Sequence, residues 1–257
     1  MSITITATSA YEMDTDQNGE IALTRKNVDF INGILKIDSS YRDSWNPEVE
    51  TSSAYTITKK FYVDEKFHMD ESIVEELVRR IDQENSTHLA ASGNKKGDNQ
   101  GINRTVERIC NLKDFDNRLR NSDFGLVNEI ATAVPNRKNI SFATKFCAFV
   151  SQFAFAGSKE DDGYCIYDKF IGKVLPYYAW FYTGEKYLNR NHNSNIEKIV
   201  KGENGYSDYC RIVERILDES AKVTGYRISK ADFDKLIWYC YKGRESRIQK
   251  ALDNVNK

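Results

Sequence analysis

Two residues of opposite charge, Lys145 and Asp168, are the ones in this chain whose types and spacing best suit catalysis. Each stands near the start of a predicted amphipathic helix, and a short polar loop joins the two helices. A lysine and a carboxylate in one cleft can break a glycosidic bond, because the amine attacks the sugar C1′ carbon and the carboxylate stabilises the developing positive charge. We therefore expect the two side chains to face one cleft, about one sugar's breadth apart.

The lysine must lose its proton before it can attack, because only the neutral amine is a nucleophile. Burial or a neighbouring cation lowers the pKa of a lysine, and Lys138, Lys169 and Lys173 are the cations close by in the sequence. If water attacks instead, Lys145 binds or orients the substrate. Lysines and aspartates at helix starts are also common as surface and capping residues, which is the structural alternative for this pair.

Hydrophobic periodicity places both residues beside an apolar stripe rather than on it. In the helix predicted to start at Asn139 or Ser141, Lys145 lies off the stripe, whose members are Phe142, Phe146, Phe149 and Phe153. In the next helix Asp168 lies off the stripe, whose members are Ile166, Phe170, Val174 and Tyr177. Pro176 lacks a backbone N–H, so this second helix should kink or restart there.

Helical periodicity continues through most of the chain from residue 70. Asp70 and Ser229 stand where helix N-caps are expected, and Asp232 completes a capping box with Ser229. The other predicted helices have these apolar stripes: Ile73, Leu77, Val78 and Ile81; Ile102, Val106 and Ile109; Leu126, Val127, Ile130 and Val134, ending before Pro135; Tyr209, Val213, Ile216 and Leu217; and Phe233, Leu236, Ile237 and Cys240. Residues 92–101 and 183–206 are predicted loops. The sequence therefore predicts a mainly α fold of roughly seven helices.

Residues 1–65 give the weakest secondary-structure signal. Ile3 and Ile5 alternate with threonines, which favours a short strand near the N-terminus. Residues 55–63 are rich in β-formers and predict a strand or an irregular arm. Residues 28–37 are largely apolar but carry an Asn-Gly pair in the middle, which is typical of a turn.

The bulk composition is that of a globular protein. The chain has 257 residues, 40% of them hydrophobic, and a formal net charge of −1, so any nucleic-acid binding must come from a local basic face. No stretch approaches the about 18 apolar residues of a membrane span, and the N-terminus lacks the pattern of a secretion signal. The five cysteines lack CxxC spacing and the three histidines do not cluster, so we expect reduced thiols, no metal and no cofactor. We expect a cytoplasmic monomer that forms one two-lobed domain over residues 1–257.

The region over residues 139–182 resembles the catalytic core of the helix-hairpin-helix DNA glycosylases, most closely their bacterial 8-oxoguanine-glycosylase-like branch. The matching runs are Ala143-Thr144-Lys145, on the first helix, and residues 164–168, which lead into the second. The resemblance implies an all-α, two-lobed fold that flips a base out of double-stranded DNA and cleaves its N-glycosidic bond. It also implies that Asp168 is the essential carboxylate and that Lys145 is the nucleophile.

Two features depart from the family pattern. The usual hairpin has a glycine-rich turn whose backbone amides hold a DNA phosphate, whereas residues 136–141 contain no glycine. The 23-residue spacing from Lys145 to Asp168 is also slightly longer than in the family. Without that turn, side chains and the free backbone amides at the helix start would bind the phosphates. The residues that we expect to bind DNA are Arg137, Lys138, Ser141, Lys169 and Lys173. A solvated charged face is the alternative for these residues.

Aromatic residues crowd the segment over 164–182. A flipped base needs flat apolar walls, which aromatic rings provide by stacking. We assign Tyr167, Trp180 and Trp238 to a base pocket; the two tryptophans lie off the apolar stripes of their helices. Aromatic stripes at helical spacing more often form the protein core, which is the alternative here.

The leading hypothesis is a DNA glycosylase that excises a modified or damaged base from double-stranded DNA, either in repair or in defence against foreign DNA. The second hypothesis is a non-catalytic helical module that binds nucleic acid or protein. A third, a helical toxin or antiphage effector of another chemistry, has no supporting motif. Release of a base from modified duplexes separates the first two hypotheses.

Overall fold

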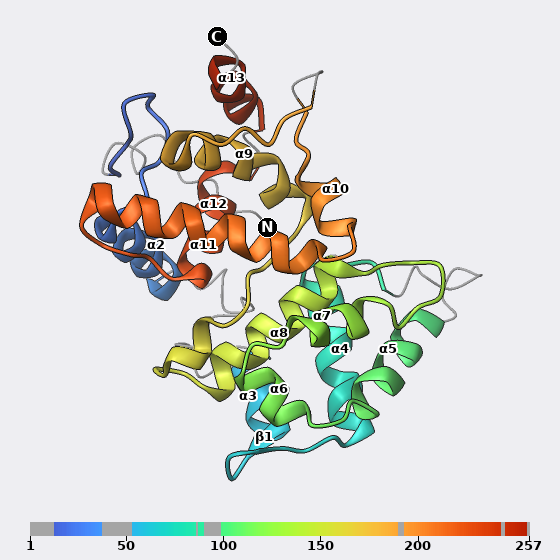
Figure 1. Cartoon of the computed structure of the whole chain (residues 1–257). Helices are drawn as coiled ribbons and strands as arrows, with labels where there is room; N and C mark the ends of the chain where they lie inside the picture. Colours follow the sequence, from blue (N-terminus) through green and yellow to red (C-terminus); the bar gives the residue numbers. More distant parts are fainter. Residues whose placement is uncertain are drawn as a thin grey trace. The chain divides into compact units, whose positions relative to one another are not determined.

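The computed structural model describes residues 13–37, 53–85, 87–89, 99–189, 193–242 and 245–255 (Figure 1). Over these residues the protein is mainly helical, with 12 α-helices and two short strands. The predicted mainly α class is therefore confirmed. The strand expected at Ile3 and Ile5 lies outside the described residues.

The chain divides into two compact units. The first, called here the central unit, spans Asp38–Tyr167. The second, the terminal unit, combines Met1–Ile37 with Asp168–Lys257, so it is built from both ends of the chain. The chain passes between the units twice, after Ile37 and again at the peptide bond that joins Tyr167 to Asp168.

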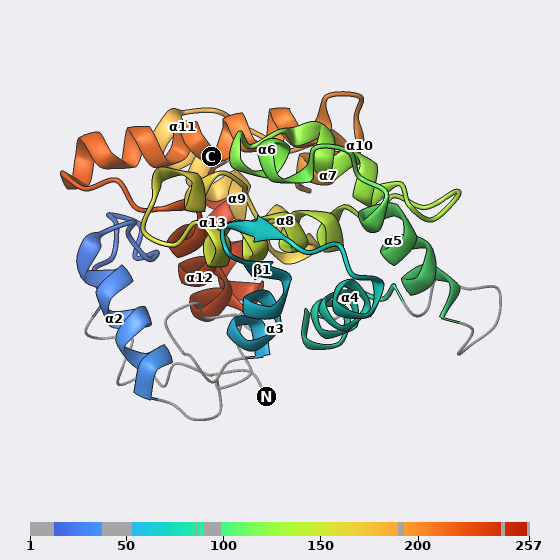
Figure 2. The same ribbon diagram turned by 90° about the horizontal axis from the view of Figure 1, so that it is seen from below.

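Helix α8, Ile140–Ala154, is the helix around which the central unit packs (Figure 1). It contacts α3, α4, α6 and α7, and η3 as well. The other elements of this unit are α3 (Ser53–Phe61), β1 (Tyr62–Val63), β2 (Lys66–Phe67), α4 (Glu71–Asn85), α5 (Gln100–Cys110), α6 (Phe115–Arg120), α7 (Phe124–Ala131) and the 3₁₀-helix η3 (Lys159–Asp162). Figure 2 shows α3 and α4 side by side, below the β1 strand.

Phenylalanine rings fill the space between α8 and its neighbours. The Phe146 ring of α8 lies 6.4 Å from that of Phe61 on α3 and 6.3 Å from that of Phe115 on α6, centroid to centroid. Phe67 on β2 joins the same cluster, 5.2 Å from Phe61. These long-range contacts between rings from four elements hold α8 in place, because buried aromatic side chains contribute large apolar areas.

In the terminal unit, α9 (Lys169–Thr183) packs against four other helices. Those are α10 (Ile196–Lys201), α11 (Gly205–Thr224), α12 (Lys230–Tyr241) and α13 (Glu245–Val255); α2 (Arg25–Ile37) packs on α12. The α10–α11 junction requires a glycine, because a Cβ atom at Gly205 would stand only 2.2 Å from the carbonyl oxygen of Val200.

The predicted helix caps are confirmed. The Asp70 carboxylate accepts hydrogen bonds from the N–H groups of Ser72 and Ile73 at the start of α4. Ser229 caps α12 by accepting from the Asp232 N–H at 3.0 Å, and its hydroxyl donates to the Asp232 carboxylate at 2.7 Å. The stripes predicted for α4, α5, α11 and α12 are almost entirely buried, as expected for core-facing positions.

Several predictions of local structure were wrong. Residues 55–63 form the end of helix α3 followed by β1, because Ile57 and Phe61 are buried where α3 packs on α4 and α8. Helix α2 runs unbroken through the Asn32-Gly33 pair. Helix α9 continues through Pro176, so the expected restart is wrong there, while the alternative of a kink stays a prediction. Helix α7 ends at Ala131, and Gly101, predicted as loop, lies in α5. Helices α6, α10 and α13 were not predicted from the sequence, and α6 and α10 have only six residues each.

Candidate functional site

Lys145 lies in the middle of α8 and is buried, with 7% of its surface exposed. Every residue from Phe142 to Ser151 is buried, so this helix has no solvent-facing side along that stretch. Lys145 is therefore not the surface lysine that the structural alternative described. Its Nζ atom lies 3.4 Å from the Ser141 Oγ atom, one turn earlier. Burying a lysine is costly, because its charged form loses solvation, and such residues are correspondingly rare in protein interiors.

Asp168 is the N-cap of α9. Its Oδ1 atom accepts a hydrogen bond from the Ile171 N–H at 2.8 Å, and the residue is partly exposed. The structure thus gives the carboxylate the capping role foreseen as the structural alternative. The same bond holds one carboxylate oxygen in a fixed position at the N-terminus of α9.

The shared cleft of the two residues stays a prediction. Lys145 belongs to the central unit, whereas Asp168 belongs to the terminal unit and begins its segment Asp168–Lys257. Within the central unit, however, the residue before Asp168 is fixed to α8. The Thr144 Oγ1 atom accepts a hydrogen bond from the Tyr167 N–H at 3.1 Å and lies 3.3 Å from the Tyr167 carbonyl oxygen.

The turn that precedes α8 reaches its shape without glycine. Helices α7 and α8 pack against each other across residues 132–139. In this turn Asn136 takes a left-handed conformation with φ 60°, which asparagine tolerates better than most residues. The Asn139 N–H closes the turn by donating to the Ala131 carbonyl at 2.7 Å. Asparagine at position 136 therefore supplies the left-handed backbone conformation of this turn.

The predicted DNA-binding residues are divided between the two units. Arg137 is exposed, while Lys138 and Ser141 are partly buried, at or just before the start of α8 in the central unit. Burial lowers the pKa of the Lys138 ammonium. Lys169 and Lys173 are exposed on the first turns of α9 in the terminal unit. In the terminal unit the two lysines therefore follow Asp168 on α9, whereas in the central unit Arg137 and Lys138 precede the helix that carries Lys145.

The three predicted pocket aromatics have different surroundings. Tyr167 is buried in the central unit. Trp180, on α9 of the terminal unit, is partly exposed and its ring lies 6.0 Å from that of Tyr177. Trp238, on α12, is partly exposed, and the Lys242 ammonium lies 3.8 Å from its ring centroid. Trp180 and Trp238 make their ring contacts with different neighbours, so a common base pocket stays a prediction.

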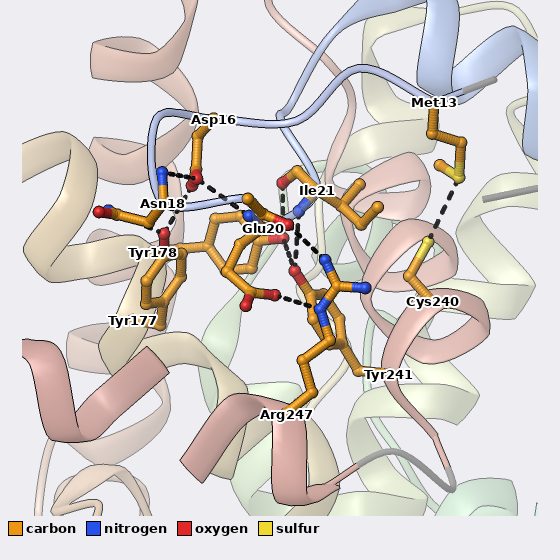
Figure 3. Close-up of polar contacts among 11 residues, drawn as sticks. Met13, Asp16, Asn18, Glu20, Ile21, Tyr177, Tyr178, Cys240, Tyr241 and Arg247 are labelled. Atoms are coloured by element: carbon orange, nitrogen blue, oxygen red, sulfur yellow. Dashed lines mark hydrogen bonds and ion pairs between the residues drawn. The ribbon is translucent and has the colours of Figure 1, made fainter. Parts of the chain in front are cut away.

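The structure also shows a polar cluster in the terminal unit that the sequence analysis missed (Figure 3). Tyrosines from α9 and α12 hold the N-terminal segment over residues 13–24 through its backbone. The Tyr178 hydroxyl donates to the Ile21 carbonyl at 2.8 Å, and the Ile21 N–H donates to the Tyr241 hydroxyl at 3.0 Å. The two hydroxyl oxygens are 3.0 Å apart, and burial raises the pKa of both tyrosines.

Charged residues complete this polar cluster. Glu20 is buried and pairs with Arg247 of α13, with 2.9 Å between the carboxylate and the guanidinium. Asp16 accepts a hydrogen bond from the Tyr177 hydroxyl at 2.6 Å. The bonded residues lie 63 to 227 positions apart in the sequence, so no local pattern could have revealed the cluster. Because its groups satisfy one another, we interpret it as a clamp on the N-terminal segment.

The Glu20 carboxyl should make stability depend on pH. Burial raises its pKa above the ordinary value of 4.5, so the folded chain binds this proton more tightly than the unfolded chain does. This contribution to stability is complete below pH 4.5 and is lost as the pH rises through the folded-state pKa. Glu20→Gln should remove that part of the pH dependence, measured as the melting temperature between pH 4.5 and pH 8. Glu107→Gln, at an exposed position on α5, is the control, and an unchanged profile for Glu20→Gln would contradict the prediction.

The described residues also bear on the expectations for metal ligands, thiols and membrane-spanning helices. They contain no group of three or more histidine, cysteine, aspartate or glutamate side chains placed to hold a metal ion. The five cysteines are free thiols, four of them buried, as predicted. In the described ranges, no helix combines the length and the apolar character needed to cross a membrane. His192 lies outside the described residues.

Comparison with known proteins finds a family model and a curated relative that match part of this chain. A family model named HI_0787_N, described as an N-terminal domain, matches residues 39–154. A protein of Haemophilus influenzae, described as an uncharacterized protein, is 28% identical over 123 residues, which make up 46% of this chain and 52% of that protein. The chain therefore spans about half the length of the curated relative that it matches. No solved structure matches it.

The family match coincides with a structural unit. Residues 39–154 lie entirely within the central unit and end with the last residue of α8. The matched region therefore contains Lys145 and the basic turn before α8, but not Asp168. The chain is similar to this family over the central unit alone.

Proposed function

We propose that the protein is a DNA glycosylase that flips a modified or damaged base out of double-stranded DNA and cleaves its N-glycosidic bond. The observation that carries the proposal is the burial of Lys145, which has 7% of its surface exposed on α8. An interior lysine is costly and marks a candidate functional residue. This lysine also stands in the Ala-Thr-Lys run that resembles the position of the glycosylase nucleophile.

In the proposed reaction the neutral amine of Lys145 attacks C1′ of the flipped nucleotide. The C1′–N bond breaks, and its electron pair leaves with the base, which takes up a proton. Asp168 stabilises the positive charge that develops on the sugar during this step. After the sugar ring opens, the amine is held as a Schiff base. If water is the nucleophile, Asp168 keeps its role and Lys145 orients the substrate.

The experiment that tests the function is base release from a panel of duplexes that contain oxidised, methylated or glucosylated bases. The proposal expects release of at least one free base, with the abasic product in equal amount. A chain that binds these duplexes and releases no base from any of them would favour the second hypothesis, a non-catalytic binding module. The observation behind that hypothesis is the use of the Asp168 carboxylate as a helix cap. The identity of the base that is released from the panel distinguishes repair of damaged DNA from defence against foreign DNA.

Duplex binding should depend strongly on salt. Arg137, Lys138, Lys169 and Lys173 are proposed to bind phosphates, and each such interaction releases counterions. Lys138→Glu with Lys173→Glu should weaken binding and reduce the slope of log affinity against log salt by about 1 for each phosphate interaction removed. Lys222→Glu, at an exposed site on α11, is the matched control and should leave the slope unchanged. Binding that survives the double charge reversal unaltered would exclude these surfaces, and the measurement is fluorescence anisotropy between about 50 and 200 mM salt.

A further inference from the structure

Thr144 is a fully buried residue that directly precedes Lys145 on α8. Its hydroxyl oxygen accepts a hydrogen bond from the Tyr167 N–H at 3.1 Å. The same oxygen lies 3.3 Å from the Tyr167 carbonyl oxygen and 3.2 Å from that of Ser141. A hydroxyl has one proton and two acceptor sites, so it can hold the Tyr167 N–H while it donates to one of the two carbonyls.

Tyr167 is the last residue of the central unit and is joined by its peptide bond to Asp168. It lies in residues 163–168, a segment outside the helices, between η3 and α9. The Thr144 bond therefore supplies backbone pairing for Tyr167 that no helix provides. Because the Tyr167 carbonyl and the Asp168 nitrogen belong to one rigid peptide plane, a bond that fixes Tyr167 also limits where Asp168 begins.

We propose that Thr144 is a positioning residue of the Lys145–Asp168 site. From the helical turn that carries Lys145, its hydroxyl fixes the point from which the chain enters Asp168. The inference rests on the proposed glycosylase function. Its physical basis is that catalysis by a preorganised carboxylate is sensitive to displacement, and a shift of about 1 Å can cost about 100-fold in rate.

The test compares variants that keep or remove this hydroxyl. Thr144→Val has nearly the same shape but no hydroxyl, whereas Thr144→Ser retains it. Thr105 on α5 offers the matched control, because it is equally buried in the central unit and its hydroxyl donates only within its own helix, to Gly101 at 2.7 Å. Thr105→Val therefore loses a buried hydroxyl without loosening Tyr167. Thr144→Ala replaces Thr144→Val if the latter does not fold.

In steady-state base release, we expect Thr144→Val to lower kcat by about 10- to 100-fold with little change in KM. Thr144→Ser should stay within a few-fold of the natural chain, and Thr105→Val should leave kcat unchanged. A merely structural role of the threonine would instead give equal losses for Thr144→Val and Thr105→Val. That result, or failure of serine to restore kcat, would overturn the proposal.

Hydrogen exchange provides a readout that does not depend on activity. The Tyr167 amide donates to Thr144, and the Ile171 amide donates to the Asp168 carboxylate, so the two amides report on the proposed bond and on the carboxylate. We expect faster exchange at both in Thr144→Val and natural rates in Thr144→Ser and Thr105→Val. Unchanged exchange in Thr144→Val would refute the positioning role even in an active enzyme. Faster exchange in a chain that releases no base from any duplex would support the positioning role and refute the glycosylase function alone.

Discussion

Replacing Asp168 by asparagine should lower base release by about 10²- to 10³-fold, while duplex binding persists or tightens. The amide keeps the shape of the carboxylate but removes the negative charge that stabilises the developing cation on the sugar. Asparagine is also as good an N-cap as aspartate, so the bond to the Ile171 N–H should remain and the fold should be little affected. The reduced activity can then be assigned to charge rather than to a damaged helix start.

Single-turnover base release on the preferred duplex measures this effect, with the melting temperature recorded for each variant. Asp70→Asn is the matched control, because Asp70 caps α4 in the same way but has no proposed catalytic role. The Asp161 carboxylate, in η3, accepts a hydrogen bond from the Gly157 N–H, and for this reason we do not expect it to substitute for Asp168. Full activity of Asp168→Asn would refute the mechanism with either nucleophile.

Borohydride should trap a covalent complex between the natural chain and its DNA substrate, and Lys145→Gln should abolish it. The Schiff base forms only if the amine of Lys145 attacks C1′, and a glutamine amide cannot replace it. Glutamine is neutral and similar in length, so burying it at this position carries no cost of desolvating a charge. The trapped complex is measured by denaturing electrophoresis, and the modified residue is identified by mass spectrometry.

Lys138→Gln controls for loss of a nearby lysine, since Lys138 is partly buried just before α8 and its pKa is lowered by burial. It should retain the trapped complex. If water is the nucleophile, no complex forms with the natural chain and Lys145→Gln has only a mild effect on base release. A complex that persists in Lys145→Gln would exclude Lys145 as the nucleophile.

Local signals in the sequence predicted the helices well where caps and apolar stripes were both present. Asp70 and Ser229 cap α4 and α12 as expected, because capping depends on bonds within the first turn. The prediction was wrong for residues 55–63, where β-branched residues favoured a strand but packing of Phe61 against α8 stabilises a helix. Helices α6 and α10 are too short to show a full apolar period.

The sequence predicted that Lys145 lies on one helix and that Asp168 stands at the start of the next, but not the surroundings of either residue. From the off-stripe position we expected Lys145 to face a cleft, with a surface lysine as the alternative, and neither expectation showed that α8 is enclosed by elements that come from residues 53–162. Such burial results from long-range packing, which periodicity within one helix does not report. The bond between Thr144 and Tyr167 spans 23 residues and joins a helix to a loop, so it leaves no pattern either.

The central claim is that Lys145 and Asp168 act on one sugar from one cleft. The measurement that tests it most directly is the distance between the Lys145 Nζ atom and the nearer Asp168 carboxylate oxygen in a crystal structure of the full chain. The proposed mechanism predicts that both atoms line one cleft, separated by about 5–9 Å, the span over which paired groups act on a glycosidic bond. Side chains on opposite surfaces, with no cleft that contains both, would contradict the catalytic assignment.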